Sequence, residues 1–410
     1  MQIRVASLVL MIMILLLSFD MLAGPLRYYL AQVGLESTVY VPKAACLLFV
    51  VWEIVRGRMS RVLFYVILLL ALFAFVGLVQ NVGIFSIFFS LFVISPFLFG
   101  IATARYFSES EDIFVLILIF VFAVTALGVY LDVFLDFPWK GFAYTLNDLD
   151  IEGSREWGTF GFERVAGFTR MSAAAAFYLA CSALFLFNYS RSWWHKLLVV
   201  LIASPSLLVT TNKAGIGGFV LGLASIGLSD YPRVQRMLVY GLASTVVFLP
   251  ISSIVRNYEL DLADPVSLIL LASFEDRLNN TWPNFFAAVA RFGNSLFGVG
   301  IGGVGSPIKF FASGSREILA VADNFALYLY GCFGLVSVAL FLYFGRVAVK
   351  LFASQNLRNR SLAPVMVALL AASLTTDIIE AQILSLMLGI VIAVPHNSFN
   401  LSSFSTGAKI

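Results

Sequence analysis

The stretch IFVLILIFVFAVTALGVYL, residues 113–131, contains no charged side chain. A helix of these 19 residues is about 28 Å long, which matches the roughly 30 Å hydrocarbon core of a bilayer. Acidic residues bound the stretch, with Asp112 before it and Asp132 after it. The stretch therefore predicts a membrane-spanning α-helix.

Similar apolar stretches fill most of the chain on both sides of this one. Hydrophobic residues make up 60% of the 410 residues, charged residues make up only 12%, and the mean hydropathy is +0.95. Soluble domains are about half apolar and a quarter charged, so this composition excludes a soluble protein. We expect an all-α, polytopic integral membrane protein with about 12 transmembrane helices. The ranges are Val5–Ala23, Val39–Val55, Val62–Gln80, Val82–Ala104, Ile113–Leu131, Met171–Phe187, Leu197–Thr210, Ala214–Leu228, Met237–Val255, Asp323–Phe344, Leu362–Thr375 and Ile378–Val394. A count of ten or eleven stays open, because the pair around Thr211–Lys213 and the last two ranges are short.

Lys and Arg in the short connections predict the orientation, because cytoplasmic loops of membrane proteins are enriched in these residues. With Arg4 on the cytoplasmic side, every short basic connection falls on that side. Both termini are then cytoplasmic, and the first apolar range is expected to be an uncleaved anchor. The net charge of +3 follows from this asymmetry, so we expect membrane lipids and no nucleic acid as partners.

Only two connections are long, and this orientation places both on the outer face. They divide the chain into helices 1–5 in residues 1–131, a first long loop in 132–170, helices 6–9 in 171–255, a second long loop in 256–322, and helices 10–12 with a cytoplasmic tail in 323–410. In the second loop, Asp264-Pro265 and Trp282-Pro283 each place a proline where a helix begins. Short interfacial helices are expected to follow them.

Two short patterns in these loops are too general to assign a function. FGVGIGGVG at residues 297–305 contains the pattern GxGxxG, but no strand precedes it, as a dinucleotide site requires. It is either a turn whose amides approach an anion or a turn without a ligand. Asp148-Leu149-Asp150 has the form of a DxD metal site, yet no third ligand accompanies it. We favour a solvated acidic loop there, and we expect no metal ion and no cofactor.

Lys213, in the segment TTNKAGIGG, lies between two apolar ranges. An ionisable residue inside a membrane is energetically unfavourable and is a functional-site hypothesis by default. The alternative is an ordinary interfacial lysine in a short outer turn. Glu380 and Gln382 in the last range are expected to form polar contacts between helices.

Four motifs follow one another in a distinctive order. They are Glu163-Arg164-Val165-Ala166-Gly167 before a span, Thr210-Thr211-Asn212-Lys213-Ala214-Gly215 between two short spans, Arg277 with Trp282 and then Ser295-Leu296-Phe297-Gly298-Val299-Gly300, and Ala322-Asp323-Asn324-Phe325 leading into Tyr330–Leu335. This order resembles the superfamily of O-antigen ligases and O-antigen polymerases. Those proteins are membrane glycosyltransferases that join lipid-linked glycans at the periplasmic face of the bacterial inner membrane. The motifs cover about residues 155–345, and in the second of them Lys213 stands where the family has arginine.

The fourth motif departs from the pattern of the ligases. Ligases that act on the lipopolysaccharide core have a histidine directly before the asparagine, and this chain has Asp323 there. Both histidines, His195 and His396, fall on the expected cytoplasmic side, so neither can replace it. The resemblance therefore favours a polymerase of oligosaccharide repeat units over a ligase.

The resemblance implies a donor glycan on undecaprenyl pyrophosphate and a hydroxyl of the next lipid-linked unit as acceptor. Arg164 and Arg277 are expected to bind the phosphates, because guanidinium groups bind phosphate oxygens bidentately, with Lys213 as a further charge. Asp323, and after it Glu163, are the candidate general bases, although Asp323 is also placed to cap the following helix. Further expected substrate contacts are Arg170, Arg291, Arg316 and Asn324. For Arg291 and Arg316 the alternative is an ordinary solvated charge in the loop.

Other functions remain open from the sequence. A flippase or transporter of lipid-linked sugars also fits many spans, but it predicts related halves and polar residues near the midplane. A ligase that transfers glycan to lipid A-core uses the same chemistry. A scaffold leaves the arginines of the outer loops unexplained. A polymerase is further expected to work with a chain-length regulator and a repeat-unit flippase.

Overall fold

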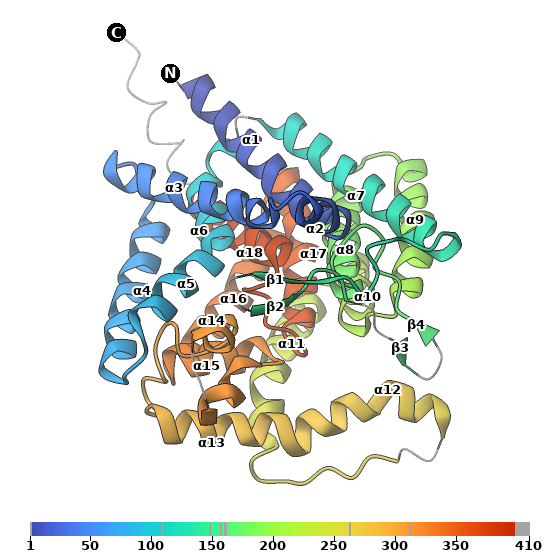
Figure 1. The fold of residues 1–410 in the computed structure, drawn as a ribbon. Helices are drawn as coiled ribbons and strands as arrows, with labels where there is room; N and C mark the ends of the chain where they lie inside the picture. Colours follow the sequence, from blue (N-terminus) through green and yellow to red (C-terminus); the bar gives the residue numbers. More distant parts are fainter. Residues whose placement is uncertain are drawn as a thin grey trace.

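The computed structural model describes residues 2–108, 110–146, 149–155, 158–159, 162–261, 264–311 and 314–397. Helices make up most of it, and Figure 1 shows α17 and α18 near the centre. The elements up to residue 163 are α1 (Gln2–Met21), α2 (Ala23–Gln32), η1 (Glu36–Tyr40), α3 (Val41–Val55), α4 (Arg61–Val79), α5 (Ile84–Val93), α6 (Ser95–Thr103), η2 (Tyr106–Ser108), α7 (Glu111–Phe134), β1 (Ala143–Leu146), β2 (Leu149–Glu152), β3 (Gly158–Thr159) and β4 (Phe162–Glu163). The remaining elements are α8 (Ser172–Tyr189), α9 (Trp193–Thr210), α10 (Lys213–Gly227), α11 (Pro232–Ser252), α12 (Pro265–Asp276), η3 (Arg277–Thr281), α13 (Trp282–Phe292), α14 (Ser306–Phe311), η4 (Gly314–Ala320), α15 (Phe325–Phe333), α16 (Val336–Phe352), α17 (Leu357–Ala372) and α18 (Gln382–Asn397).

Several long apolar helices indicate a membrane-embedded protein, as the composition predicts. Six segments in the described part of the chain are long and apolar enough to cross a membrane, and up to eight are if two bent helix pairs each count as one span. The expected number of 12 is not confirmed. The six are Glu36–Val55, Arg61–Val79, Glu111–Phe134, Ser172–Tyr189, Trp193–Thr210 and Pro232–Val255.

The difference arises where apolar ranges are interrupted. The chain bends by 83° between α1 and α2 and by 47° between α5 and α6. The expected span Asp323–Phe344 is divided into α15 and α16 by Gly334, which has a φ of 57°. Hydropathy does not distinguish one long helix from two short ones, because both have the same composition.

The core is built by α6, α8, α17 and α18. Side chains along α8 and α17 are buried almost throughout, so other helices surround these two. Gly100 of α6 and Gly389 of α18 allow these helices to approach closely, because a Cβ on Gly389 would lie 2.2 Å from the carbonyl oxygen of Phe97. Small residues have this role in many membrane helix pairs.

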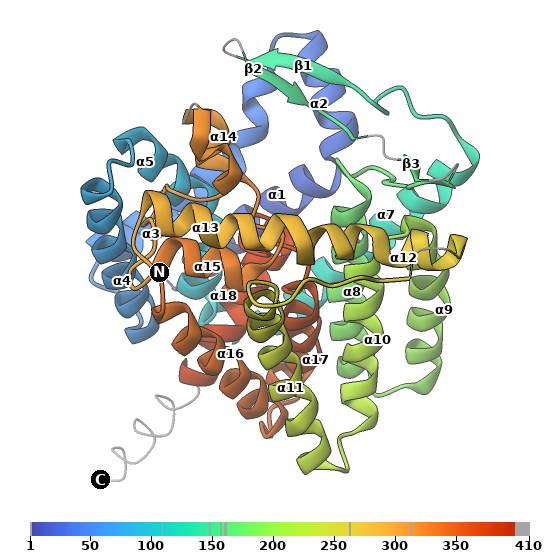
Figure 2. The same ribbon diagram turned by 90° about the horizontal axis from the view of Figure 1, so that it is seen from below.

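The two long connections gather at one end of the helices. Figure 2 shows α2, the β1–β2 hairpin and α14 at this end, while α12, η3 and α13 form a rod across the axes of α9, α10 and α11. We call this end the loop face. The structure begins α12 at Pro265, whereas α13 continues from η3 at Trp282, so Trp282-Pro283 does not start a separate helix. The hairpins β1–β2 and β3–β4 in the first connection were not predicted.

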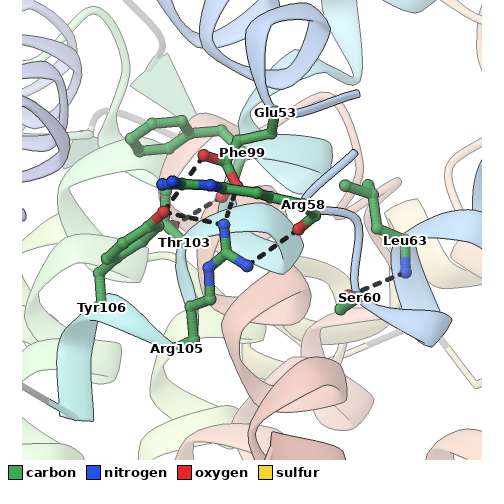
Figure 3. A network of polar contacts seen from close by, with 8 residues as sticks. All are labelled: Glu53, Arg58, Ser60, Leu63, Phe99, Thr103, Arg105 and Tyr106. Carbon is green, nitrogen blue, oxygen red and sulfur yellow. Dashed lines mark hydrogen bonds and ion pairs between the residues drawn. The ribbon is translucent and has the colours of Figure 1, made fainter. Parts of the chain in front are cut away.

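A polar network joins the opposite end of α3 to the segment after α6 (Figure 3). Glu53 is only 1% exposed and forms an ion pair with Arg105. The hydroxyl of Tyr106 donates to Glu53 at 3.2 Å, and Arg105 Nη1 donates to the carbonyl of Arg58 at 2.9 Å. The buried carboxylate is therefore neutralised and hydrogen-bonded, as a charge in this environment requires.

Candidate functional site

Three of the predicted phosphate-binding cations meet on the loop face. Arg164 follows strand β4, Lys213 begins α10, and Arg277 begins the π-helical turn η3. The positive charges of Arg164 and Arg277 both act on Lys213. Segments that are far apart in the sequence thus place Arg164 and Arg277 within electrostatic range of Lys213.

Lys213 is held in place by the turn between α9 and α10. Thr211 ends α9 in the left-handed conformation with a φ of 52°, and the Asn212 side chain caps α10 by accepting a hydrogen bond from the amide of Gly215 at 2.8 Å. Lys213 precedes the apolar residues of α10 and its side chain is exposed. Partial desolvation of this exposed side chain lowers its pKa, and the charges of Arg164 and Arg277 lower it further.

Arg277 and Asp323 form the centre of the site. Arg277 Nε lies 3.3 Å from Asp323 Oδ2, and Arg277 Nη1 donates to the Ser273 hydroxyl at 3.4 Å. The side chains of Arg277 and Asp323 are 21% and 37% exposed, so both remain accessible to a ligand. A π-helical turn between two α-helices is frequent at functional sites, because the wider turn projects side chains differently from an α-helix.

Asn324 has a structural role in place of the predicted substrate contact. It is fully buried, its Oδ1 accepts from the Leu327 amide at 3.0 Å, and its Nδ2 donates to the carbonyls of Val246 and Leu374, both at 3.1 Å. It therefore caps α15 and ties this helix to its neighbours. The alternative role of Asp323 as the cap is also corrected, because Asn324 takes that position and Asp323 faces Arg277.

Asp132 positions Arg164, and sequence reasoning missed it. Asp132 lies in the last turn of α7 and is buried. Its Oδ2 accepts from the amides of Ala166 and Gly167 at 3.0 and 2.8 Å, and its Oδ1 lies 3.0 Å from Lys140 Nζ. The turn after Arg164 is thereby fixed to α7. An acidic residue at the end of an apolar helix was the available signal.

Glu163 is not brought to Arg277 and Asp323 by any described contact. Its Oε1 accepts a hydrogen bond from Lys140 at 2.7 Å, and its side chain is 49% exposed. The structure thus gives this carboxylate an ion pair within the first connection. This arrangement removes the support for Glu163 as an alternative base.

Arg291 and Arg316 lie away from this centre. Arg291 follows Arg277 by 14 residues along the rod, which corresponds to roughly 20 Å. Arg316 donates to the carbonyls of Gln80 and Asn81 at 3.1 and 3.3 Å and so attaches η4 to the end of α4. The structure therefore does not support phosphate contacts by these two arginines at the Arg277 site, and both lie over the ring of Phe292.

A second group of cations surrounds Arg170. Arg170 Nε donates to the carbonyl of Glu152 at 3.0 Å, and the charges of Arg27 and Lys43 lie within electrostatic range. Burial, and then the charges of Arg27 and Arg155, lower the pKa of Arg170 to about 10. Sequence reasoning named Arg170 but missed Arg27 and Lys43.

Carboxylates separate the two groups of cations. Asp377 lies within electrostatic range of both Asp323 and Glu380, and Glu380 lies within range of Lys43. Glu380 Oε1 also accepts a hydrogen bond from the Ser306 amide at 2.9 Å, which holds the start of α14. Glu380 was expected to form polar contacts between helices. It lies before α18 and contacts the first residue of α14.

The glycine-rich segment supports the fold, and hydrogen bonds within the protein use several of its amides. Its amides at Val299, Ile301 and Gly305 donate to the carbonyls of Gly331, Phe73 and Leu319 at 2.7, 3.0 and 2.9 Å. Gly300 has a φ of 89°, and a Cβ there would lie 2.3 Å from the amide nitrogen of Gly77. Only glycine fits this close contact with α4.

The histidines lie far from the site, as predicted. His195 is in the first turn of α9, whose other end carries Thr210 beside Lys213, and α9 spans 18 residues or about 27 Å. His396 lies near the end of α18, whose other end begins beside Glu380. Asp148 of the DxD pattern is outside the described residues.

An apolar cavity of about 500 Å³ lies among the helices. Its walls come mainly from α4, α15, α16 and α18, and they include Phe325, two residues after Asp323. The few polar groups in its lining include Arg61, Ser90 and three tyrosines. The cavity therefore suits an apolar chain better than a sugar.

No protein-family model matches this chain. A search of the curated proteins also finds no significant match.

Proposed function

We propose that this protein polymerises undecaprenyl-pyrophosphate-linked oligosaccharide repeat units into a surface polysaccharide, with the loop face on the periplasmic side of the bacterial inner membrane. The observations that support this proposal most are the ion pair of Arg277 with the accessible carboxylate of Asp323 and the position of Lys213 within electrostatic range of Arg164 and Arg277. Cations near an accessible carboxylate suit a reaction in which a pyrophosphate leaves and a hydroxyl loses a proton.

In the proposed reaction, the acceptor hydroxyl oxygen attacks the anomeric carbon of the donor. The bond from this carbon to the phosphate oxygen breaks, and undecaprenyl pyrophosphate leaves with the electron pair. Arg164 and Arg277 bind the phosphate oxygens bidentately, and Lys213 adds a point charge. Asp323 accepts the hydroxyl proton, and its neighbour Arg277 orients the carboxylate at 3.3 Å.

The apolar cavity supports a lipid-linked substrate. An isoprenoid chain has no polar group between its end and its pyrophosphate, so its binding site needs an apolar lining next to cations. The cavity of about 500 Å³ meets the first requirement, and Phe325 in its wall follows Asp323 by two residues in the sequence. In this proposal it holds part of the donor chain.

The test is complementation of a deletion strain of the native bacterium. Wild type, Arg277→Ala and Lys309→Ala are expressed to equal levels, and surface-glycan length is read on a gel. Lys309 is an exposed cation of α14 and serves as the matched control. We expect wild type and Lys309→Ala to restore long chains, and Arg277→Ala to reduce them about 100-fold, because a transition-state charge contact is lost.

Two outcomes contradict the proposal. If the deletion strain already makes chains of normal length, the protein is not the polymerase. If Arg277→Ala restores long chains like the control, Arg277 is not part of the site.

A flippase of lipid-linked oligosaccharides is the second candidate. Asp20 and Lys43, within the apolar helices α1 and α3, favour it, because ionisable residues inside membranes often mark transport pathways. The same deletion strain distinguishes the two functions. Precursor that accumulates at the inner leaflet indicates a flippase, whereas single repeat units attached at the surface indicate a polymerase.

A further inference from the structure

A second group of cations on the loop face lacks ion-pair partners. Arg27 of α2, Lys43 of α3 and Arg170 before α8 lie within electrostatic range of one another. In the described part of the chain, none of the three has a carboxylate oxygen within the 4.0 Å of an ion pair. Cations gathered in this way repel one another, so the arrangement needs a reason.

Neutral groups hold two of these side chains in position. Arg27 Nη1 donates to the Tyr144 hydroxyl at 2.7 Å, and Arg170 Nε donates to the carbonyl of Glu152 at 3.0 Å. Arg27 Nε is buried and has no hydrogen-bond partner. A buried guanidinium N–H without a partner is rare, and a bound anion would satisfy it.

The nearest carboxylates do not neutralise the group. Asp20 Oδ2 accepts from the Tyr178 hydroxyl at 2.8 Å, and Oδ1 accepts from Gln382 Nε2 at 3.0 Å. Both oxygens of Asp20 are thus occupied by neutral donors. With Asp20 and Glu380 counted as negative, the three cations leave a net charge of +1, which favours an anion.

The position of this group indicates a lipid anion. Arg27 lies on α2, just after the 83° bend that ends α1. Tyr28 and Tyr29 follow it directly, and Tyr40 ends η1. Arg27 lies 5.9 Å from the ring of Tyr40, and Tyr29 is 54% exposed. Tyrosines concentrate at the level of lipid headgroups, where the phosphates of lipids also lie.

Two groups of cations on one face correspond to two phosphate-bearing substrates. Electrostatic contacts run from Lys43 to Glu380, from Glu380 to Asp377, from Asp377 to Asp323 and from Asp323 to Arg277. In a polymerase, the acceptor hydroxyl belongs to a sugar that other sugars of the same unit separate from its own pyrophosphate. The acceptor pyrophosphate must therefore bind away from the reacting carbon but on the same face.

We propose that Arg27, Lys43 and Arg170 bind the pyrophosphate of the acceptor lipid, while Arg164, Lys213 and Arg277 bind that of the donor. This inference rests on the proposed function and adds to it a separate acceptor site. It also explains why cations are concentrated around α2 and α3, which lie outside the four motifs in the sequence.

The test measures binding of farnesyl pyrophosphate to purified full-length protein in phosphatidylcholine nanodiscs. Wild type, Lys43→Gln, Lys43→Arg, Arg277→Gln and the control Lys309→Gln are compared by equilibrium binding. We expect two sites in wild type and in the control. Lys43→Gln weakens one site about tenfold or more, Arg277→Gln weakens the other, and Lys43→Arg retains both, because one charged contact is worth at least a tenfold change.

Each outcome has a distinct meaning. If Lys43→Gln binds like wild type while Arg277→Gln loses a site, the acceptor site is wrong and the proposed function stands. If phosphatidylglycerol nanodiscs displace farnesyl pyrophosphate from the Lys43 site, that site binds ordinary phospholipid and the assignment to an acceptor is overturned. The deletion strain tests the proposed function separately from this binding measurement. Thermal unfolding checks that the variants are folded. Binding at the site that a variant does not change is a second check of its folding.

Discussion

At the scale of single residues, Asp323 and Asn324 divide two tasks between neighbours. Asn324 is buried and uses its whole amide to cap α15 and to bind two carbonyls, so it fixes the position of the residue before it. Asp323 is thereby held beside Arg277 with part of its side chain exposed. A residue placed by its neighbour needs no contacts of its own for stability and remains available for chemistry.

Lys213 gives a prediction of pH dependence. Its pKa is lowered first by partial desolvation and then by Arg164 and Arg277, so it loses its charge at a lower pH than an ordinary lysine. Because the charged form is the one that binds phosphate, activity falls on the alkaline side. In Lys213→Arg this fall moves to higher pH, because arginine keeps its charge. The rate of glycan polymerisation between pH 7 and pH 10.5 checks this.

Other groups that titrate in this range, Arg170 among them, are common to both proteins and cancel in the comparison. Identical alkaline profiles for wild type and Lys213→Arg contradict a role for the lysine charge.

At the scale of elements, the first long connection is ordered by one helix end. Asp132 of α7 binds the amides of Ala166 and Gly167 and pairs with Lys140, which also binds Glu163. The segment that carries Arg164 is therefore attached to a helix and does not depend on its own short hairpins. The end of α7 therefore fixes the segment that carries Arg164.

Asp132→Asn is expected to release this segment. The amide side chain keeps one acceptor oxygen but loses the charge that attracts Lys140 and strengthens both amide hydrogen bonds, at a cost of about 2 kcal/mol. Polymerisation falls together with protection of residues 162–170 from hydrogen exchange. Asp136→Asn is the matched control, since Asp136 is 99% exposed and lies 3.7 Å from the same lysine. Equal exchange protection in both variants contradicts the account.

The network around Glu53 connects elements at the other end of α3. Glu53→Gln leaves Arg105 without its buried partner, so we expect a loss of about 2 kcal/mol of stability, which is below the full value for a buried pair because Arg105 is 34% exposed. Thermal unfolding in detergent measures this loss. Glu317→Gln, at an exposed acidic residue, is the control. Activity per folded molecule stays unchanged in both, and a drop in Glu53→Gln alone gives this network a functional role that we do not expect.

At the scale of the whole molecule, apolar helices carry a charged loop face. Segments from most of the chain contribute residues to this face. Composition alone predicts the apolar helices, and the start of α12 at Pro265 agrees with the local chemistry of Asp264-Pro265. The bends that divide apolar ranges were not predicted, because they depend on how helices pack and not on composition.

The candidate site was predictable only in part. Arg164, Lys213, Arg277 and Asp323 stand out because charges in the outer connections or between apolar ranges are conspicuous, and the structure brings them together. Asp20, Arg27 and Lys43 were missed, because one charge near the end of an apolar range also fits a simple helix boundary. Asn324 was assigned to substrate because its complete set of internal hydrogen bonds is not visible in a sequence.

The most direct measurement uses purified protein and lipid-linked repeat units extracted from the deletion strain. The account predicts that wild type converts them into a ladder of longer chains and releases one undecaprenyl pyrophosphate for each new linkage. Asp323→Asn is expected to slow this reaction about 100-fold while farnesyl pyrophosphate still binds, because the proton acceptor is lost and the cations remain. Wild type that leaves the units single, or Asp323→Asn that polymerises at the wild-type rate, would contradict it.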